Sequence, residues 1–204
     1  LRFHPGEESN SEHFATQLSK LCDVYINDAF GAVHRAHASV AMLPRLFRNR
    51  GVGFLMKQEI HALSELLGRP ASPYVVVVGG TKVGDKIGVI TNLLNRIDKM
   101  IIGGAMAYTF LKAQGKKVGN SRVEEDKLLL AKAILDQAKE NRVECLLPLD
   151  HLIVKELRED AETETTEGDE IPDGWLGVDI GPKTIEAYRN ALAGCKTIFW
   201  NGPM

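Results

Sequence analysis

The chain has 204 residues, with 25 Lys and Arg against 27 Asp and Glu, which gives a formal net charge of -2. This near-neutral charge argues against nucleic-acid binding, since neutralising phosphates requires an excess of basic residues. No apolar run approaches the roughly 20 residues that a membrane-spanning helix needs, and residues 1–6 lack the layout of a signal peptide. The three cysteines contain no CxxC pair, so they fit neither a disulfide framework nor a zinc site and favour a reducing, cytoplasmic compartment.

The two ends of the sequence are unusual for a complete protein. Residue 1 is Leu, and the chain stops at Met204, directly after a strand and where Pro203 would suit the start of a helix. We therefore expect an internal fragment, with a short complete protein as the alternative.

The first third of the chain mixes helical and extended patterns. Ser9 followed by Glu12 has the spacing of a capping box and predicts a helix over about 10–21. Residues 23–28 predict a strand that runs into a loop. A second helix, ended by Gly68 and Pro70, is indicated by apolar residues at helical spacing, which are Met56, Ile60, Leu63 and Leu67. We expect this helix to connect two domains.

From about residue 71 the pattern changes to alternating strands and helices. Four apolar runs without alternation, typical of strands buried on both faces, lie at 75–78, 100–102, 145–147 and 197–200. Apolar residues at helical spacing lie between them, at 83–97, 128–138 and 185–192. This alternation implies right-handed crossovers and an open parallel α/β sheet. The acidic stretch 155–173 is expected to be a solvated loop or small flap.

The segment 75–86, VVVVGGTKVGDK, carries the clearest chemical signal. A buried strand ends in two glycines, which allow a ligand to approach the backbone, and a helix is predicted to begin at about Val83. Lys82 and Lys86 are four residues apart and oppose the helix dipole unless an anion is bound. A phosphate ligand is the functional hypothesis, and a tight turn with solvated lysines is the alternative. Neither the Walker A pattern nor GxGxxG occurs.

Two further strand ends have the same character. Gly103 and Gly104 follow the second predicted strand, and Asn201 with Pro203 follows the last one. Because ligands bind at the carboxyl ends of strands in open parallel sheets, these ends suggest one crevice. Close packing of helix against sheet is the alternative reason for the glycines. Residues 177–182, GVDIGP, are interpreted as a glycine-rich turn.

A separate basic cluster lies upstream. His34, Arg35 and His37 share a short turn, and Arg2 and His4 could join them. The Arg fork suits phosphate or carboxylate, and surface ion pairs are the alternative. A metal site at the histidines lacks matching ligands of suitable spacing. Neither a serine-nucleophile motif nor a paired-carboxylate arrangement is evident.

Taken together, these segments resemble phosphoglycerate kinase. The matching segments appear in the family's order along the whole chain, at 1–4, 23–31, 32–39, 53–56, 79–86, 101–111, 173–184 and 200–203. The connector at 5–11 is more similar to bacterial members. Thr81 and Ala105 depart from the family's usual residues, but both are small.

The resemblance implies an α/β fold of two lobes, each an open and mostly parallel sheet flanked by helices, with both lobes incomplete. Residues 1–55 would belong to the N-terminal lobe, 56–69 to a long interdomain helix and 70–204 to the nucleotide-binding lobe. The implied activity is glycolytic transfer of a phosphoryl group between 1,3-bisphosphoglycerate and ADP, giving 3-phosphoglycerate and ATP, with Mg²⁺ bound to the nucleotide. It also implies a cytoplasmic monomer without nucleic-acid or membrane partners, and a fragment that alone has little activity.

The resemblance also assigns residues by position. Arg2, His34 and Arg35 would hold the acid. Lys82 would bind the nucleotide phosphates, and Lys86 would follow the phosphoryl group, so that Lys82, Lys86 and Arg35 are the catalytic candidates. The remaining nucleotide-binding candidates are Gly80, Gly103, Gly104, Gly177, Val178, Asn201 and Pro203. A non-catalytic module that binds a nucleotide or a phosphosugar is the alternative function, and a purely structural role with solvated cations is the second alternative.

Overall fold

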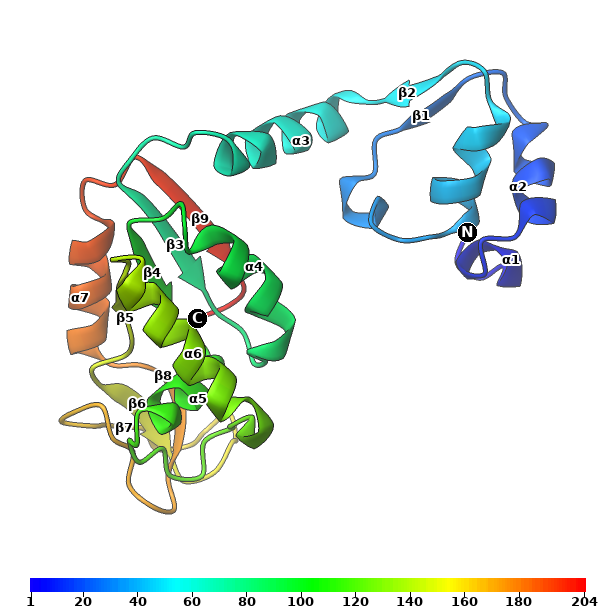
Figure 1. Ribbon diagram of the computed structural model, residues 1–204. Helices are drawn as coiled ribbons and strands as arrows, with labels where there is room; N and C mark the ends of the chain where they lie inside the picture. Colours follow the sequence, from blue (N-terminus) through cyan, green and yellow to red (C-terminus); the bar gives the residue numbers. More distant parts are fainter. The chain divides into compact units, whose positions relative to one another are not determined.

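The computed structural model describes residues 1–204, and the chain divides into two compact units, residues 1–69 and 70–204 (Figure 1). Each unit has its own buried side chains. No helix reaches the length and hydrophobicity that crossing a lipid bilayer requires. The predicted limits of the two lobes stay a prediction.

Unit 1 contains three helices and one pair of strands. The elements are α1 (Pro5–Glu8), α2 (Glu12–Ser19), β1 (Tyr25–Asn27), β2 (Arg50–Val52) and α3 (Phe54–Leu67). Strands β1 and β2 pair in parallel, with Ile26 opposite Gly51. A small core beside them is formed by Phe14, Ala15, Ala38, Leu43 and Phe47.

The helix predicted over 10–21 is present as α2, but the predicted capping residue is wrong. Ser11 is the N-cap, and its hydroxyl accepts a hydrogen bond from Phe14 N at 3.4 Å. Ser9 instead ends α1 and donates its hydroxyl to Pro5 O. The short helix α1, opened by Pro5, has Ser9 as its C-cap, so the second helix begins two residues later than the motif indicates.

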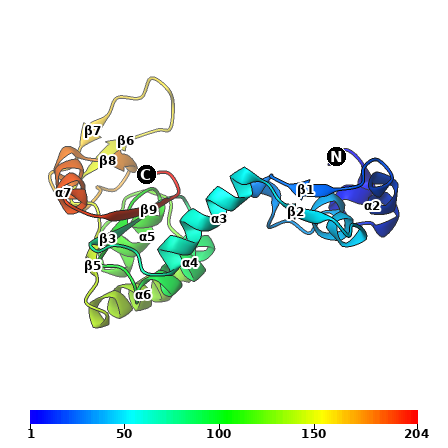
Figure 2. The same ribbon diagram turned by 90° about the horizontal axis from the view of Figure 1, so that it is seen from above.

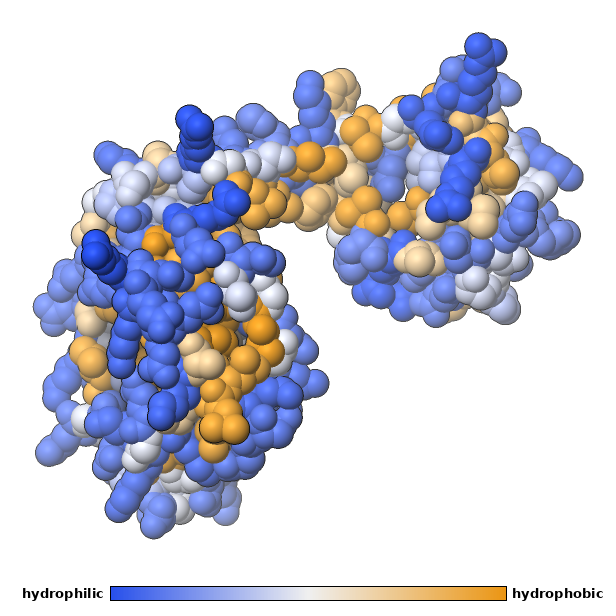
Figure 3. Space-filling model, viewed as in Figure 1, coloured by the Kyte–Doolittle hydropathy of each residue, from blue (hydrophilic) through white to orange (hydrophobic).

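Helix α3 matches the predicted apolar spacing but buries little of it. Met56 is its one buried residue, whereas Phe54 is 91% exposed and Ile60 and Leu67 are also exposed. Figure 3 shows hydrophobic residues on the visible face of this helix. Its role as a connector between two lobes stays a prediction.

Unit 2 is built on a four-stranded parallel sheet in the order β5-β4-β3-β9. The strands are β3 (Tyr74–Val78), β4 (Lys99–Ile102), β5 (Glu144–Leu146) and β9 (Thr197–Asn201). All four apolar runs are therefore strands. Every residue of the inner strand β3 is buried, but the expectation of burial on both faces is wrong for β5 and β9, which lie at the edges of the sheet and are partly exposed. This confirms the predicted parallel sheet flanked by helices.

Four helices flank this sheet. They are α4 (Ile87–Leu93), α5 (Met106–Ala113), α6 (Leu128–Glu140) and α7 (Pro182–Leu192). Helix α7 lies on one side of the sheet and α4, α5 and α6 lie on the other (Figures 1 and 2). Of the predicted stripe of α7, Tyr188 is buried and Leu192 is partly buried, whereas Ile185 is exposed. Thr184 and Ala191 are buried beside them.

A second, antiparallel sheet has the order β7-β6-β8, with β6 (His151–Val154), β7 (Glu164–Thr165) and β8 (Leu176–Ile180). The interpretation of 177–182 as a turn is therefore wrong, since Gly177 to Ile180 belong to β8. The reason is local: Ile153 pairs with Gly177 and Leu152 pairs with Asp179, so Val178 is an extra residue in a β-bulge. The acidic stretch 155–173 contains β7 and the loops on either side of it, which is consistent with the predicted small flap.

Candidate functional site

The carboxyl ends of three parallel strands meet in unit 2. Gly79 N donates to Asn201 O at 2.9 Å, which joins the ends of β3 and β9. Gly103 N donates to Val78 O at 2.8 Å, and Met106 N donates to Gly80 O at 2.9 Å, which joins the ends of β3 and β4. The structure therefore brings the three predicted strand ends together.

Close packing explains some of the glycines without a ligand. Gly104 has a φ of +63°, and a Cβ there would lie 2.6 Å from Gly80 N. A Cβ at Gly79 would collide with the Pro203 carbonyl. Larger side chains at these positions would force the turns apart. Close packing thus accounts for the glycines at positions 79 and 104.

The two lysines after β3 have different surroundings. Lys86 is partly buried, and its Nζ donates a hydrogen bond to Asn201 Oδ1. Lys82 is exposed and forms no hydrogen bond or ion pair. One ammonium group is therefore held by a neutral acceptor at the end of β9, and the other is open to solvent.

The helix start differs from the prediction. A 3₁₀ turn at Gly84–Lys86 precedes α4, which has its first residue at Ile87. Val83 N is not available to an external anion, because it donates to the Glu124 carboxylate. The prediction that the first-turn N–H groups await a ligand is therefore wrong at Val83, where the chain supplies its own anion.

A small cavity of about 80 Å³ is lined by residues of the turn after β4 and of α5, β6 and β8. Gly104, Gly177 and Val178 all line it, although they are far apart in the sequence. The bulge in β8 leaves Val178 without a strand partner and 39% exposed. These three predicted residues therefore share one cavity beside the junction of the strand ends.

Tyr108 and His151 line the same cavity, and sequence reasoning missed both. Their rings lie 5.5 Å apart between centroids, tilted by 52°. Burial raises the pKa of Tyr108 to about 12, with Asp179 adding to the shift. A Cβ at Gly177 would lie 2.7 Å from Tyr108 Cε1, so the tyrosine ring packs directly against that glycine. No catalytic or binding motif identifies either residue, because folding places each at the cavity and a single sequence does not display that position.

His151 is fully buried, and only one of its two ring nitrogens has a hydrogen-bond partner. Nε2 lies 3.2 Å from Asp169 O, and since a carbonyl can only accept, Nε2 carries the proton of the neutral ring. Nδ1 has no hydrogen-bond partner. Burial lowers the pKa of His151, against the opposing effects of Asp169 and Asp150. The neutral form is therefore the one that fits this site.

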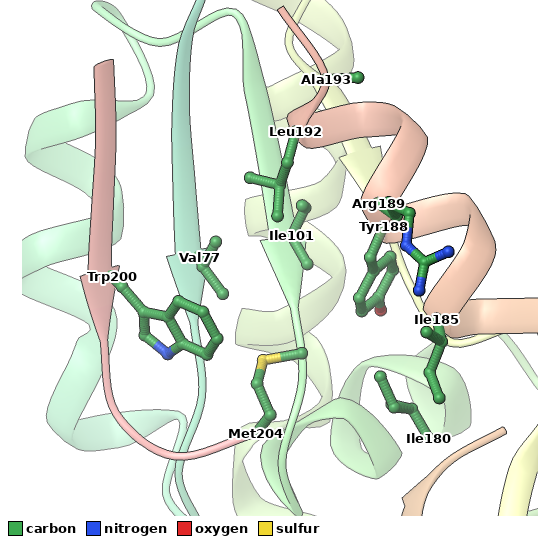
Figure 4. A pocket seen from close by; sticks show the side chains of 10 residues that line it. All are labelled: Val77, Ile101, Ile180, Ile185, Tyr188, Arg189, Leu192, Ala193, Trp200 and Met204. Carbon is green, nitrogen blue, oxygen red and sulfur yellow. The ribbon is translucent and has the colours of Figure 1, made fainter. Parts of the chain in front are cut away.

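A separate apolar cavity of about 500 Å³ lies beside α7 and contains none of the predicted site residues. Figure 4 shows Trp200 of β9, Met204 and Tyr188 of α7 around it, with Val77 and Ile101 of the sheet. Its side chains offer few polar atoms to orient a ligand.

The basic cluster of unit 1 is partly engaged in local contacts. Arg2 Nε pairs with Glu8 Oε1 at 2.5 Å, and both side chains are exposed. His4 stacks on Phe14 with ring centroids 3.8 Å apart, and its Nδ1 accepts from Gly6 N. The ion-pair alternative therefore holds for Arg2, and His4 has a structural role as the cap of α1.

The remaining basic residues follow the 3₁₀ turn at Phe30–Ala32. His34 and Arg35 are exposed, and their side chains form no hydrogen bond or ion pair, whereas Arg35 N donates to Ala32 O at 3.0 Å. His37 Nδ1 lies 3.9 Å from the buried Glu7 carboxylate, which also binds Ser39. No group of three or more His, Cys, Asp or Glu side chains is arranged to hold a metal ion.

These features define a class: an α/β protein with a parallel sheet, in which strands end in glycines at their carboxyl ends and lysines lie beside them, at the edge where ligands bind in open parallel sheets. A sequence profile of one family, described as phosphoglycerate kinase, matches residues 1–204. The chain therefore belongs to the phosphoglycerate kinase family.

Individual relatives agree with this assignment. The chain is 54% identical over 204 residues to the phosphoglycerate kinase of Anaeromyxobacter dehalogenans and 55% identical to that of Pseudothermotoga lettingae, covering all of this chain and 52% and 51% of those proteins. The solved structure of phosphoglycerate kinase from Coxiella burnetii is similar, with a TM-score of 0.87 and 39% identity over 100% of this chain and 52% of that one. The chain thus spans about half the length of the curated relatives that it matches.

Proposed function

We propose that this chain provides the nucleotide-binding residues and part of the acid-binding residues of a phosphoglycerate kinase. The reaction is reversible transfer of a phosphoryl group from 1,3-bisphosphoglycerate to ADP, giving 3-phosphoglycerate and ATP. The observation that supports it most is the meeting of three strand ends beside Lys82 and Lys86, in a chain that matches this family throughout. Phosphoryl transfer chiefly requires positioning and charge neutralisation, which this arrangement can supply.

Unit 2 would hold the nucleotide. Gly80, Gly103 and Pro203 lie at the strand-end junction, while Gly104, Gly177 and Val178 line the adjoining cavity. Lys82, exposed and without a partner, is suited to bind nucleotide phosphates as they arrive.

Lys86 is suited to bind the phosphoryl group during its transfer. Asn201 holds its ammonium group through a neutral amide oxygen, which a phosphate oxygen can replace at little electrostatic cost. Lys86 would thereby neutralise charge on the phosphoryl oxygens as transfer proceeds, and Asn201 would keep it near that position beforehand.

Unit 1 would bind the acid through Arg2, His34 and Arg35. Arg35 and His34 are exposed and unpaired, so their donors are available to a carboxylate or phosphate. Arg2 binds Glu8 through Nε, and its guanidinium retains other donors for a ligand. Residues 1–55 and 70–204 are the proposed lobes, with 56–69 as the helix between them.

Mg²⁺ is proposed to arrive with ATP or ADP, where it would offset the charge of the phosphates. The residues of this chain do not form a cluster that fits the ion, so no protein ligand is assigned here. We further propose a cytoplasmic, monomeric protein without nucleic-acid or membrane partners.

The test is a chimera in which these 204 residues replace the matching half of the Anaeromyxobacter dehalogenans kinase. Transfer of phosphate from 1,3-bisphosphoglycerate to ADP, at a rate within about tenfold of the parent kinase, is expected because the matched halves are 54% identical. A folded chimera that binds ADP but transfers no phosphate would favour the non-catalytic binding module instead.

A further inference from the structure

The loop formed by residues 79–86 is held from outside at its start, where Gly79 N donates to Asn201 O, and at three further places. Met106 N on α5 binds Gly80 O, Asn201 binds Lys86 Nζ, and the Glu124 carboxylate binds Val83 N. Glu124 makes the contact at the centre of the loop, since Val83 is flanked in sequence by the glycine pair with Lys82 on one side and by Lys86 on the other.

Glu124 is itself fixed to the body of unit 2. Its backbone N–H donates to Thr109 Oγ1 at 3.1 Å, and Thr109 is a buried residue of α5. Val123, the residue before it, packs against the cluster that contains Tyr108, Leu111 and Val118. The backbone of Glu124 is therefore anchored to α5, and the hydrogen bond of its carboxylate links α5 to the loop.

The bond is specific to the loop backbone. Val83 is fully buried, so water does not reach its N–H, and loss of the carboxylate would leave that donor without a partner. The next backbone bond, from Lys86 N to Val83 O at 2.9 Å, closes the 3₁₀ turn that carries Lys86. A displacement at Val83 is therefore passed to the start of the Lys86 side chain.

We propose that Glu124 is a positioning residue for the phosphate-binding lysines. By accepting a hydrogen bond from Val83 N, it holds the 79–86 loop in the conformation in which Lys82 and Lys86 can both bind the nucleotide phosphates. This rests on the proposed function of the loop. Glu124 acts through the backbone and does not contact the substrate. A carboxyl side chain is suited to this because a charge-assisted acceptor holds an N–H more firmly than a neutral one, and an amide oxygen can still accept from the same donor.

The test compares Glu124→Ala with Glu124→Gln in the chimera described above and in the 204-residue chain. Glu124→Ala is expected to lower kcat of the chimera by about 10- to 100-fold, since small misplacements of catalytic groups cost rates of this order. ADP affinity should fall less than kcat. Glu124→Gln retains an acceptor for Val83 N and should keep kcat and the ADP dissociation constant within about threefold of the unsubstituted protein.

Glu125→Gln is the matched control. Glu125 is the neighbouring residue and pairs with Lys112 on the surface, without contact to the loop. Its loss should leave kcat and ADP affinity unchanged. This variant measures the effect on kcat and ADP affinity of removing one negative charge near Glu124 without removing the hydrogen bond to Val83 N.

Four outcomes would overturn the proposal. Normal kcat in a folded Glu124→Ala chimera would do so, and so would a Glu124→Gln chimera as slow as the alanine variant. A lower melting temperature with unchanged kcat would show that Glu124 has only a structural role. Tighter ADP binding by Glu124→Gln would show that the charge of Glu124 repels the phosphates.

Failure of the unsubstituted chimera to transfer phosphate contradicts the proposed function instead, and the inference is then decided by ADP affinity in the 204-residue chain. There the alanine variant must bind ADP more weakly than the glutamine variant.

Discussion

The side chain of Lys86 donates a hydrogen bond to Asn201 Oδ1, across 115 positions of the sequence. It joins the turn before α4 to the carboxyl end of β9, and both residues lie at the junction where three parallel strands end. Because the acceptor is neutral, the ammonium charge of Lys86 remains uncompensated by any carboxylate. The contact therefore defines a cation that is oriented but still able to bind an anion.

The first prediction concerns the proposed catalytic role of Lys86. In the chimera, Lys86→Ala should lower kcat by about 10²–10³-fold, by analogy with removal of one oxyanion donor, while ADP affinity changes much less. Lys99→Ala is a suitable control because Lys99 lies at the amino end of β4 and pairs with Glu144. Steady-state kinetics and calorimetry with ADP make the comparison. Near-normal turnover of the Lys86 variant would reject the assigned role.

The second prediction concerns Asn201. Asn201→Asp should replace the neutral acceptor of Lys86 by a charged one, which both holds the ammonium group more firmly and repels the phosphates. We expect the ADP dissociation constant to rise by about tenfold, equivalent to roughly 1.4 kcal/mol. High salt should reduce the difference. An unchanged affinity at low salt would show that Asn201 lies outside the phosphate site.

The third prediction concerns the packing of Tyr108 on Gly177. Gly177→Ala would place a Cβ against the tyrosine ring and should cost about 1–3 kcal/mol of unfolding free energy through overpacking. For a chain of this size that corresponds to a decrease in melting temperature of about 2–4 °C per kcal/mol.

Gly168→Ala is the control for this substitution. A Cβ at Gly168 would meet no atom within 4 Å, so its melting temperature should change little. Equal melting temperatures for the two alanine variants would contradict the packing seen at Gly177.

The fourth prediction follows from the buried ring of His151. Burial lowers its pKa in the folded protein below the ordinary 6.5, so the unfolded chain binds the proton more readily than the folded one. The stability contributed by the neutral ring is complete above about pH 6.5 and declines as the pH falls below that value. The melting temperature should fall accordingly with decreasing pH.

His151→Phe should weaken this decline, because phenylalanine keeps an aromatic ring beside Tyr108 and cannot be protonated. His61→Gln is the control, since His61 is exposed on α3 and pairs only with Glu65. A pH profile of His151→Phe that parallels the unsubstituted chain would exclude His151 as the group responsible.

Much of unit 2 could be predicted from the sequence. Strands β3 and β4 are continuous apolar runs because they are buried on both faces, whereas the edge strands β5 and β9 are apolar but partly exposed. Helix α6 has the apolar spacing of a helix that covers a sheet. The glycine pairs marked the strand ends. These are local signals, set by burial and by backbone freedom, and a single sequence displays them.

Other features depend on partners that are distant in the chain. Strand β8 was interpreted as a turn because its glycine and its bulge hide the alternation that identifies a half-buried strand, and only pairing with β6 reveals it. Ser11 rather than Ser9 caps α2 because α1 occupies the preceding residues.

The candidate site also combines features that the sequence indicates with features that depend on tertiary contacts. The sequence indicated that Lys82, Lys86 and the glycines belong to a phosphate-binding region, since clustered cations near a strand end are unfavourable without an anion. Tertiary structure alone decided that Asn201 would hold Lys86, that Glu124 would accept from the N–H of Val83, and that Tyr108 would pack against Gly177 and beside His151. The physical reason is that hydrogen bonding and desolvation depend on which atoms meet in space, whereas periodicity and composition describe only neighbours along the chain.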